Sequence, residues 1–462
     1  MAVRDGGLCS EPHDETKKHF VSNSGSSGPL GSEITQAGSR NRRIKPASIA
    51  ACVLACATFL LAGCGGEKHV REEIPRLYSA DDSQFVQTMG GMLGPALVSG
   101  NRFHAYTNGD QIFPAMLEAI AGARETICFE TYIYWSGAIG HKFAEALAER
   151  AKAGVKVHVL LDWLGSNKIE HDAIENMERA GVNVMRYHSL RWYDLRRFNN
   201  RTHRKLLIID GRTGFTGGVG IADQWNGNAQ DPDHWRDPHY RVDGPVVTQM
   251  QSVFMDNWIK ATGKVLHGGE YFPIIKPDGD GLAQMFGSSP SGGAESMKLM
   301  YLLAITSAQR TIYLSSAYFV PDDLTAKALV EAAKRGVQVQ IITPGKYIDT
   351  LTVRRASRAR WGELLEAGIE IYEYQPTMYH CKMMVVDERF VSVGSTNFDS
   401  RSFSINDEAN LNIVDQTFAR ARIETFRADL AQSQRITLKQ WQDRPFRDKV
   451  LEHAASLIGR QL

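Results

Sequence analysis

The chain has 462 residues, of which 43% are hydrophobic and 23% are charged, so it is long enough for two domains or for one duplicated unit. Its 53 Lys and Arg residues nearly balance 52 Asp and Glu residues, and the formal net charge is +1. This balance argues against a protein that binds nucleic acid through its net charge, and we expect no nucleic-acid partner.

The first 64 residues change abruptly in character. Residues 1–40 are rich in Ser and Gly, and we expect a disordered extension or a stretch that precedes the true start. A basic cluster then leads into the apolar run at 47–61, so residues 41–64 are predicted to be a signal sequence. Its last four residues, Leu-Ala-Gly-Cys, resemble the lipobox of bacterial lipoproteins, which implies cleavage before Cys64 and lipid attachment to its thiol.

An uncleaved membrane anchor is the alternative interpretation of this segment, because the apolar run is near the lower length limit for a transmembrane helix. Both interpretations predict a bacterial membrane-anchored protein, and the lipoprotein interpretation predicts that it faces the periplasm or the cell exterior.

From residue 99 onward the chain repeats a helix followed by a strand. Three pairs of segments align: 118–134 with 303–319, 146–161 with 328–343, and 178–187 with 365–374. In the second and third pairs a glycine stands where a left-handed residue commonly ends a helix, namely at Gly154, Gly181, Gly336 and Gly368. Strands that alternate with helices of this length predict an α/β sheet covered on both faces, and two equal halves predict pseudo-twofold packing.

The repeats also suggest boundaries for the parts of the chain. We expect a linker at 65–98, a first half at 99–262, a linker rich in Gly, Ser and Pro at 263–293, a second half at 294–434 and a helical tail at 435–462. Two cysteines follow the leader, Cys128 and Cys381, and their positions offer neither a disulfide framework nor a metal site. We expect both to be free.

Each half ends in the same motif, His-x-Lys-x-x-x-x-Asp, once at 203–210 and once at 380–387. The apolar residues inside the motif predict a buried strand. Because strand side chains alternate between faces, His380 and Lys382 should share one face and Asp387 should point the other way. A single copy is compatible with an ordinary strand, whereas two copies in one chain indicate a shared function.

With these motifs the chain resembles the phospholipase D superfamily, and most closely the bacterial cardiolipin synthases, over nearly all of residues 99–440. The residues that match the superfamily signature, and that the resemblance implies are catalytic, are His203, Lys205, Asp210, His380, Lys382 and Asp387. The resemblance implies two tandem phospholipase D-like domains, each a mixed β-sheet flanked by helices, packed with pseudo-twofold symmetry.

The same resemblance implies a phosphatidyltransferase that uses no metal and no cofactor. One phosphatidylglycerol would give its phosphatidyl group to the enzyme, and a second would accept it while glycerol leaves. A phosphodiester needs cations on its oxygens and a proton on its leaving group, and two His and two Lys can supply both. By analogy we assign His203 as the nucleophile and His380 as the acid and base, although the sequence does not rank them. The expected partners are phosphatidylglycerol and a membrane, and the internal duplication predicts a functional monomer.

Further residues are expected to support the site. Glu408 and Asp237, each one strand after a motif, are predicted to orient the histidines, since the motif aspartates lie on the wrong face. The resemblance puts Ser395 and Asn397 in the phosphate pocket, and the glycine run around Gly218 offers backbone amides there. The insert at 191–198 interleaves Arg with aromatic residues, which suits either a solvated loop or a lip that meets phosphates and the membrane interface.

Two alternative functions stay open at this point. Hydrolysis by the same site, on phospholipid or nucleic acid, is the first, because water competes with the acceptor alcohol. A non-catalytic lipoprotein scaffold is the second, although both motifs are whole.

Overall fold

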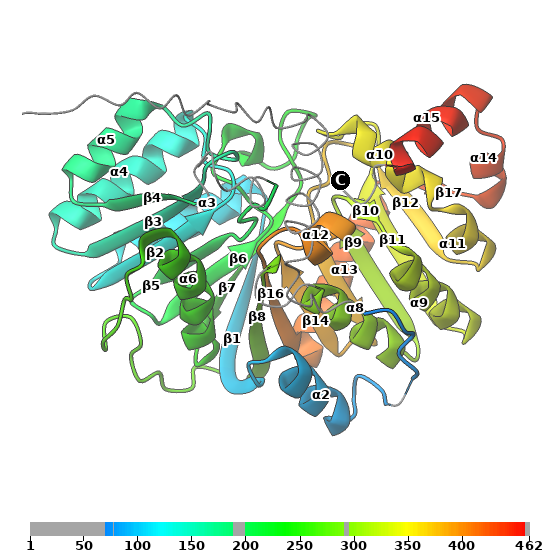
Figure 1. Ribbon diagram of the computed structural model, residues 1–462, viewed down its shortest axis with the longest axis horizontal. Helices are drawn as coiled ribbons and strands as arrows, with labels where there is room; N and C mark the ends of the chain where they lie inside the picture. Colours follow the sequence, from blue (N-terminus) through cyan, green and yellow to red (C-terminus); the bar gives the residue numbers. More distant parts are fainter. Residues whose placement is uncertain (1–69, 77, 188–198, 291–294, 458–462) are drawn as a thin grey trace, which may run out of the picture. The chain divides into compact units, whose positions relative to one another are not determined.

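A 15-stranded sheet runs through the part of the chain that the computed structural model describes, which is residues 70–76, 78–187, 199–290 and 295–457 (Figure 1). The predicted signal sequence, the lipid attachment at Cys64 and the insert at 191–198 lie outside the described residues. Within the described residues, no helix combines the length and the apolar character that crossing a membrane requires.

The strands of the first half are β1 (Val98–Thr107), β2 (Thr126–Thr131), β3 (Lys156–Asp162), β4 (Asn183–Tyr187), β5 (Leu206–Ile209), β6 (Thr213–Gly217) and β7 (Pro238–Asp243). Those of the second half are β8 (Gly281–Ser288), β9 (Thr311–Ser316), β11 (Gln338–Pro344), β12 (Glu370–Tyr374), β13 (Lys382–Val386), β14 (Phe390–Gly394), β16 (Glu408–Val414) and β17 (Ser433–Ile436). A separate two-stranded sheet pairs β10 (Phe319–Val320) with β15 (Phe398–Asp399).

The two halves have equivalent strand orders when the strands are counted outward from the middle of the sheet. From β1 outward it is β1-β7-β6-β5-β2-β3-β4, and from β8 outward it is β8-β16-β14-β13-β9-β11-β12, with β17 added at the edge. The strands β1 and β8 pair antiparallel at the junction. Three strands in each half run parallel and the others antiparallel, so each half has a mixed sheet. The predicted pair of α/β halves with pseudo-twofold symmetry is confirmed.

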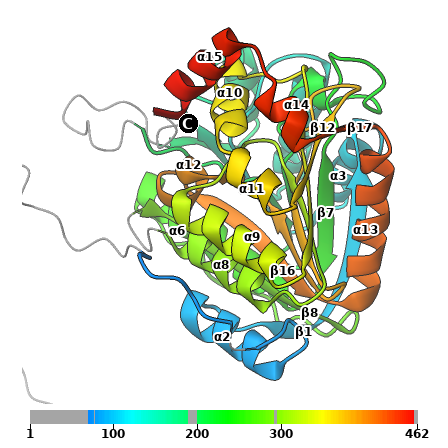
Figure 2. The same cartoon turned by 90° about the vertical axis from the view of Figure 1, so that its right-hand side faces the viewer.

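Helices cover both faces of the sheet. They are α2 (Ser83–Leu93), α3 (Gly109–Ala121), α4 (Ala138–Lys152), α5 (His171–Arg179), α6 (Val246–Thr262), α8 (Ser296–Ser307), α9 (Asp323–Lys334), α10 (Leu351–Ala359), α11 (Gly362–Glu366), α12 (Ser400–Ser404), α13 (Gln416–Leu430), α14 (Leu438–Gln442) and α15 (Phe446–Leu457). Helices α6 and α13 contribute to one shared core, while α3 to α5 and also α8, α9 and α11 belong to cores on the opposite face. Figure 2 shows α13 along one side of the sheet and α8 and α9 along the other.

The predicted helix ends are confirmed by the backbone. Gly154, Gly181, Gly336 and Gly368 all have φ between 86° and 100°, a left-handed conformation that glycine adopts without steric cost. The two cysteines of the described chain, Cys128 and Cys381, are buried and free, as expected.

Two predicted linkers are wrong, because each contains a packed element. The linker at 263–293 contains β8, which lies near the middle of the sheet between β1 and β16. Its glycines suggested a loop, but they allow close packing: a Cβ on Gly281 would lie 2.2 Å from the Phe103 ring. The linker at 65–98 contains α2, whose Phe85 and Met89 are buried against the second half.

The tail at 435–462 is helical where it is described, apart from the end of β17. It provides α14 and α15, and α15 packs against α10 through a small core that includes Val353, Ala356 and Ala455. Buried ion pairs strengthen this contact, since Arg358 and Arg444 both bond the Glu452 carboxylate at 3.1 and 2.7 Å. The tail is therefore an integral part of the second half.

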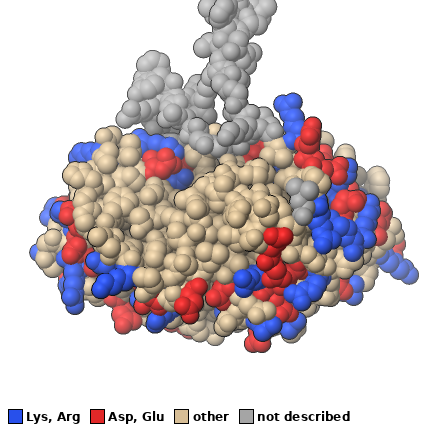
Figure 3. Space-filling view, turned by 90° about the horizontal axis from the view of Figure 1, so that it is seen from below, with Lys and Arg blue, Asp and Glu red and all other residues tan. Residues whose placement is uncertain are grey.

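The face in Figure 3 carries Lys, Arg, Asp and Glu mainly around its margin, with both signs interleaved and a broad uncharged middle. This face presents no extended basic surface of the kind that non-specific nucleic-acid binding requires.

Candidate active site

The two His-x-Lys motifs lie at the start of β5 and β13, where the chain contacts the opposite half. The predicted alternation is confirmed along β13: Met384 and Val386 belong to the core on one face, and Cys381, Met383 and Val385 belong to the shared core on the other. His380 and Lys382 therefore lie on the face of Met384, as expected.

The backbone just before each motif histidine pairs with the opposite half. The His203 amide donates to the Asp407 carbonyl at 2.9 Å, and the His380 amide donates to the Arg236 carbonyl at 2.8 Å. Each histidine therefore lies next to the residue that follows its bonding partner, which is Glu408 in the first case and Asp237 in the second. The pseudo-twofold packing thus exchanges the two carboxylates between the halves.

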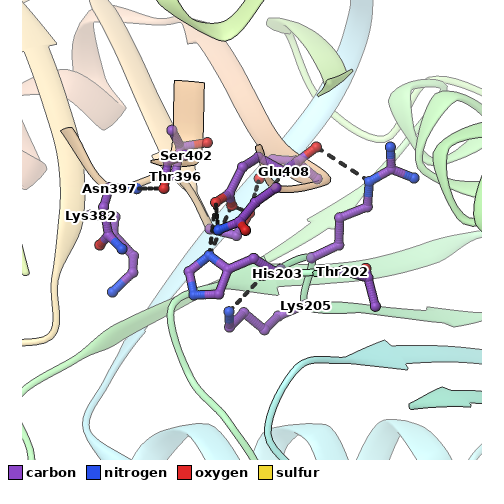
Figure 4. A network of polar contacts seen from close by, with 12 residues as sticks. Thr202, His203, Lys205, Lys382, Thr396, Asn397, Ser402 and Glu408 are labelled. Carbon is purple, nitrogen blue, oxygen red and sulfur yellow. Dashed lines mark hydrogen bonds and ion pairs between the residues drawn. The ribbon is translucent and has the colours of Figure 1, made fainter. Parts of the chain in front are cut away.

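Glu408 holds the ring of His203. Both carboxylate oxygens lie 3.0 Å from His203 Nδ1, and the Glu408 side chain is fully buried (Figure 4). The Ser395 hydroxyl donates to Glu408 Oε2 at 2.5 Å, and the Asn406 amide donates to Oε1 at 3.4 Å. With Nδ1 engaged, Nε2 is the ring nitrogen left for chemistry at His203.

Asp237 holds the ring of His380 in the equivalent way. Its Oδ2 lies 2.6 Å from His380 Nδ1 and also accepts from Trp225 Nε1 at 3.0 Å. Oδ1 of Asp237 is buried and has no hydrogen-bond partner among the described residues. Gly218 stands where the second half has Ser395, and a Cβ on Gly218 would lie only 2.5 Å from Asp237 Oδ1. The two histidine–carboxylate pairs are therefore similar in geometry but differ in hydrogen bonding.

This difference affects the protonation of the two carboxylates. Burial alone would raise the pKa of Glu408, but His203, Lys205 and the Ser395 hydroxyl together hold it below its ordinary value. Burial raises the pKa of Asp237 to about 6, against the lowering effect of neighbouring cations. Of the two carboxylates, Asp237 therefore holds a proton up to the higher pH.

The imidazoles and the ammonium groups are also shifted by burial. Burial lowers the pKa of His203 to about 4, and burial together with the nearby cations holds the pKa of His380 well below its ordinary value. Burial lowers the pKa of Lys205 to about 7 and also lowers that of Lys382. Each Nζ donates to the backbone carbonyl of its own motif histidine at 2.6 Å, so both ammonium groups lie beside the rings.

A cavity of about 540 Å³ opens over these groups. Its lining includes His203, Lys205 and His380, and residues of both halves contribute to its walls. Among the described residues, no group of three or more His, Cys, Asp or Glu side chains is arranged to hold a metal ion.

The motif aspartates, which were predicted to be catalytic, lie away from the cavity. Asp210 accepts from the backbone amides of Arg124, Glu125 and Thr126 at 2.8 to 3.2 Å. Asp387 accepts from those of Gln309, Arg310 and Thr311 at 2.7 to 2.9 Å. Neither lines the cavity, because strand alternation turns both toward the opposite face. Both carboxylates hold the turn after the motif strand against the start of its neighbour.

The three residues predicted for the phosphate pocket lie in different places. Asn397 lines the cavity, but Ser395 and Gly218 do not. Ser395 is fully buried behind Glu408, and Gly218 makes room for Asp237. Ser395 thus bonds one orienting carboxylate, and Gly218 leaves space for the other.

Comparisons with known proteins identify the family of this chain. A family model described as "Cardiolipin synthase, PLD-like domain" matches residues 116–231 and 301–430. The cardiolipin synthase of Geobacillus thermodenitrificans (strain NG80-2) is 37% identical over 356 residues, which cover 76% of this chain and 71% of that protein. The chain belongs to the cardiolipin synthase family. The expected membership of the phospholipase D superfamily is thereby confirmed.

Other relatives extend the match. Cardiolipin synthase 1 of Bacillus anthracis is 33% identical over 387 residues, which cover 82% of this chain and 75% of that protein. Among solved structures, the phosphatidylserine synthase of Haemophilus influenzae Rd KW20 superposes with a TM-score of 0.63 at 13% identity, over 82% of this chain and all of that one. At this identity the structural match supports the fold alone.

Several residues that line the cavity of this family member were missed by sequence reasoning: Tyr132, Trp135, Arg201, Trp225, Trp235, Tyr318, Asp349 and Arg401. Arg201 stands two residues before a motif, and that proximity was a usable signal. The rings of Trp225 and Trp235 lie 5.3 and 5.4 Å from the His380 ring, but they belong to the other half. No local sequence pattern predicts a contact between side chains of opposite halves.

Proposed function

We propose that the chain transfers a phosphatidyl group from one phosphatidylglycerol to another and releases glycerol, through a phosphohistidine intermediate. The observation that carries this proposal is that two His–Lys pairs, each backed by a buried carboxylate of the opposite half, line or adjoin a single cavity. Membership of the cardiolipin synthase family supports the choice of lipid and reaction.

The proposed first step forms one P–N bond and breaks one P–O bond. His203 Nε2 attacks phosphorus, the glycerol oxygen leaves, and His380 gives that oxygen a proton. Lys205 and Lys382 neutralise the non-bridging phosphoryl oxygens as charge develops on them.

The proposed second step reverses these roles. His380, now neutral, takes the proton from a hydroxyl of the acceptor phosphatidylglycerol. The resulting oxygen attacks phosphorus, and the P–N bond to His203 breaks. The free enzyme is restored with its protons in place.

The different protonation of the two carboxylates supports this assignment of roles. A nucleophilic imidazole must be neutral, and the Glu408 carboxylate stays anionic while it orients His203. A general acid must be supplied with a proton, and Asp237, which lies 2.6 Å from His380 Nδ1, holds a proton up to a higher pH than Glu408 does. We therefore keep His203 as nucleophile and His380 as acid and base.

We also propose that one chain suffices for activity, because both His–Lys pairs and both carboxylates belong to it. For membrane attachment we propose that residues 41–64 act as a lipoprotein signal and that Cys64 carries the lipid, on the pattern of the sequence alone. Cys64→Ser should then leave an unprocessed precursor. Incorporation of radioactive fatty acid into that variant at the wild-type level would refute the lipid attachment.

Product analysis tests the reaction directly. Vesicles of phosphatidylglycerol should yield cardiolipin and glycerol, and added labelled glycerol should enter phosphatidylglycerol by the reverse transfer. His203→Ala and His380→Ala serve as controls for contaminating activity. Phosphatidic acid as the sole lipid product would establish hydrolysis instead, and no product at all would favour a scaffold.

A further inference from the structure

The two walls of the cavity differ in chemistry. The first half contributes mainly apolar and aromatic side chains, which include Ile133, Trp135, Trp225 and Trp235. The second half contributes Tyr318, Asp349, Thr350 and Asn406. The repeat alignment puts Tyr318 at the position that Ile133 occupies in the first half. The pseudo-symmetric fold therefore carries an asymmetric cavity, and its polar side belongs to the second half.

This polar side is rich in hydrogen-bond acceptors. Asn406 is only 7% exposed, and its amide nitrogen donates to Glu408, so its Oδ1 is turned away from that carboxylate. This Oδ1 is buried and has no hydrogen-bond partner among the described residues. Asp349 adds a carboxylate at the cavity, where its Oδ2 accepts from the Tyr318 hydroxyl at 2.5 Å. A buried acceptor without a partner is costly unless a ligand supplies a donor.

The donor must come from a group other than the phosphodiester, whose oxygens only accept hydrogen bonds. Hydroxyl and ammonium groups both donate. An ammonium group would be attracted by the carboxylates of Asp349 and Asp399 in the cavity lining. It would also be repelled by Lys205, Arg201 and Arg401 there and by the adjoining Lys382, so the nearby cations outnumber the carboxylates. A neutral alcohol with several hydroxyl groups fits the acceptors and avoids this repulsion.

The polar side also lies close to the group that moves the alcohol proton. Asp349 and His380 line the same cavity, and the Asp349 carboxylate favours the charged form of Lys382, whose Nζ lies 3.1 Å from both ring nitrogens of His380. In the proposed reaction the leaving and the attacking alcohol both exchange a proton with His380. Both alcohols therefore occupy the same place in the cavity.

We infer that Tyr318, Asp349 and Asn406 form a polyol subsite that binds the glycerol headgroup, first as leaving group and then as acceptor. The inference rests on the proposed transfer and adds its acceptor specificity. The hydroxyl that reacts faces His380, and the other hydroxyl groups donate to Asp349 and Asn406. The subsite thereby favours a polyol over water and over a simple alcohol.

A competition between two alcohols in one reaction tests the subsite. The full chain is given phosphatidylglycerol vesicles with labelled glycerol and labelled 1-propanol at equal concentration, and both phosphatidyl products are measured. The wild type should favour glycerol. Asp349→Ala should lower the glycerol-to-propanol product ratio about tenfold or more, the loss expected when a hydrogen bond to a charged group is removed. Because both products form in one tube, the ratio does not depend on how much of the variant is folded.

Asp323→Ala is the matched control, since this carboxylate on α9 is 90% exposed and does not line the cavity. Its product ratio should equal that of the wild type. An unchanged ratio in Asp349→Ala, or an equally strong wild-type preference for ethanolamine over 1-propanol, would overturn the subsite while cardiolipin formation continued. Phosphatidic acid as the sole wild-type product would overturn the transfer itself, and the subsite with it.

Discussion

At the scale of single residues, the site is built from pairs that look equivalent but behave differently. Ser395 donates to Glu408, whereas Gly218, its counterpart, leaves Asp237 Oδ1 without a partner among the described residues. A single hydroxyl thus helps to keep one carboxylate anionic, while burial raises the pKa of the other to about 6. In the proposed mechanism this difference supports the separate roles of the two histidines, which their nearly identical motifs do not distinguish.

The pH dependence of phosphate binding should report Lys205. Burial lowers its pKa to about 7, so the ammonium charge is lost as the pH rises through that value. With a p-nitrophenyl phosphodiester, whose leaving group needs no proton from His380, log kcat/KM should fall above about pH 7 with a slope near −1. Lys205→Arg should lose this decline, because guanidinium stays charged. A flat wild-type profile up to about pH 9 would contradict the assignment.

At the scale of elements, the motif strand carries both chemistry and structure. The alternation of β13 sends His380 and Lys382 toward the cavity and Asp387 toward a turn with φ of 53°. The carboxylate of Asp387 satisfies three backbone amides at the start of β9. The periodicity of the sequence was enough to predict which side chains share a face. The periodicity could not predict that Asp387, a residue of the family signature, holds a turn of the backbone in place.

Asp387→Ala should therefore destabilise the protein more than it harms the chemistry. Three amides would lose a charged acceptor, which predicts a loss of about 3 kcal/mol in the free energy of unfolding. Denaturant unfolding measures this loss, and turnover per folded molecule should stay near that of the wild type. Glu388→Ala is the control, since within the described part of the chain the side chain of this neighbour makes a surface ion pair with Arg420 and no other hydrogen bond or ion pair. Wild-type stability combined with lost turnover in Asp387→Ala would restore a catalytic role.

At the scale of the whole molecule, duplication predicted much of the architecture. The aligned segments predicted two α/β halves, and their glycines predicted the helix ends. The sequence did not predict β8, because glycines in this segment resemble those of a loop. In the structure they allow close packing at the centre of the sheet. The exchange of Glu408 and Asp237 between the halves could not be predicted, because it depends on how two surfaces dock. His203 and Glu408 are 205 positions apart in the sequence.

This exchange predicts which histidine each carboxylate affects. Glu408→Gln should slow the formation of phosphoenzyme from a p-nitrophenyl phosphodiester, because it disturbs His203. Asp237→Asn should leave that step largely intact but slow turnover of phosphatidylglycerol by about 10²–10⁴-fold, because it disturbs proton transfer by His380. Rapid-quench measurements with both substrates separate these effects. The reverse pattern would mean that each carboxylate serves the histidine of its own half.

The central claim is a covalent intermediate on His203, and the most direct measurement is to trap and locate it. His380→Ala, given a p-nitrophenyl phosphodiester, should release one equivalent of nitrophenol in a burst and then stall, because the second step lacks its base. Peptide mapping of the stalled protein should find the phosphoryl group on His203. His203→Ala should give no burst. A burst from His203→Ala, or a phosphoryl group mapped to His380 in the wild type, would contradict the account.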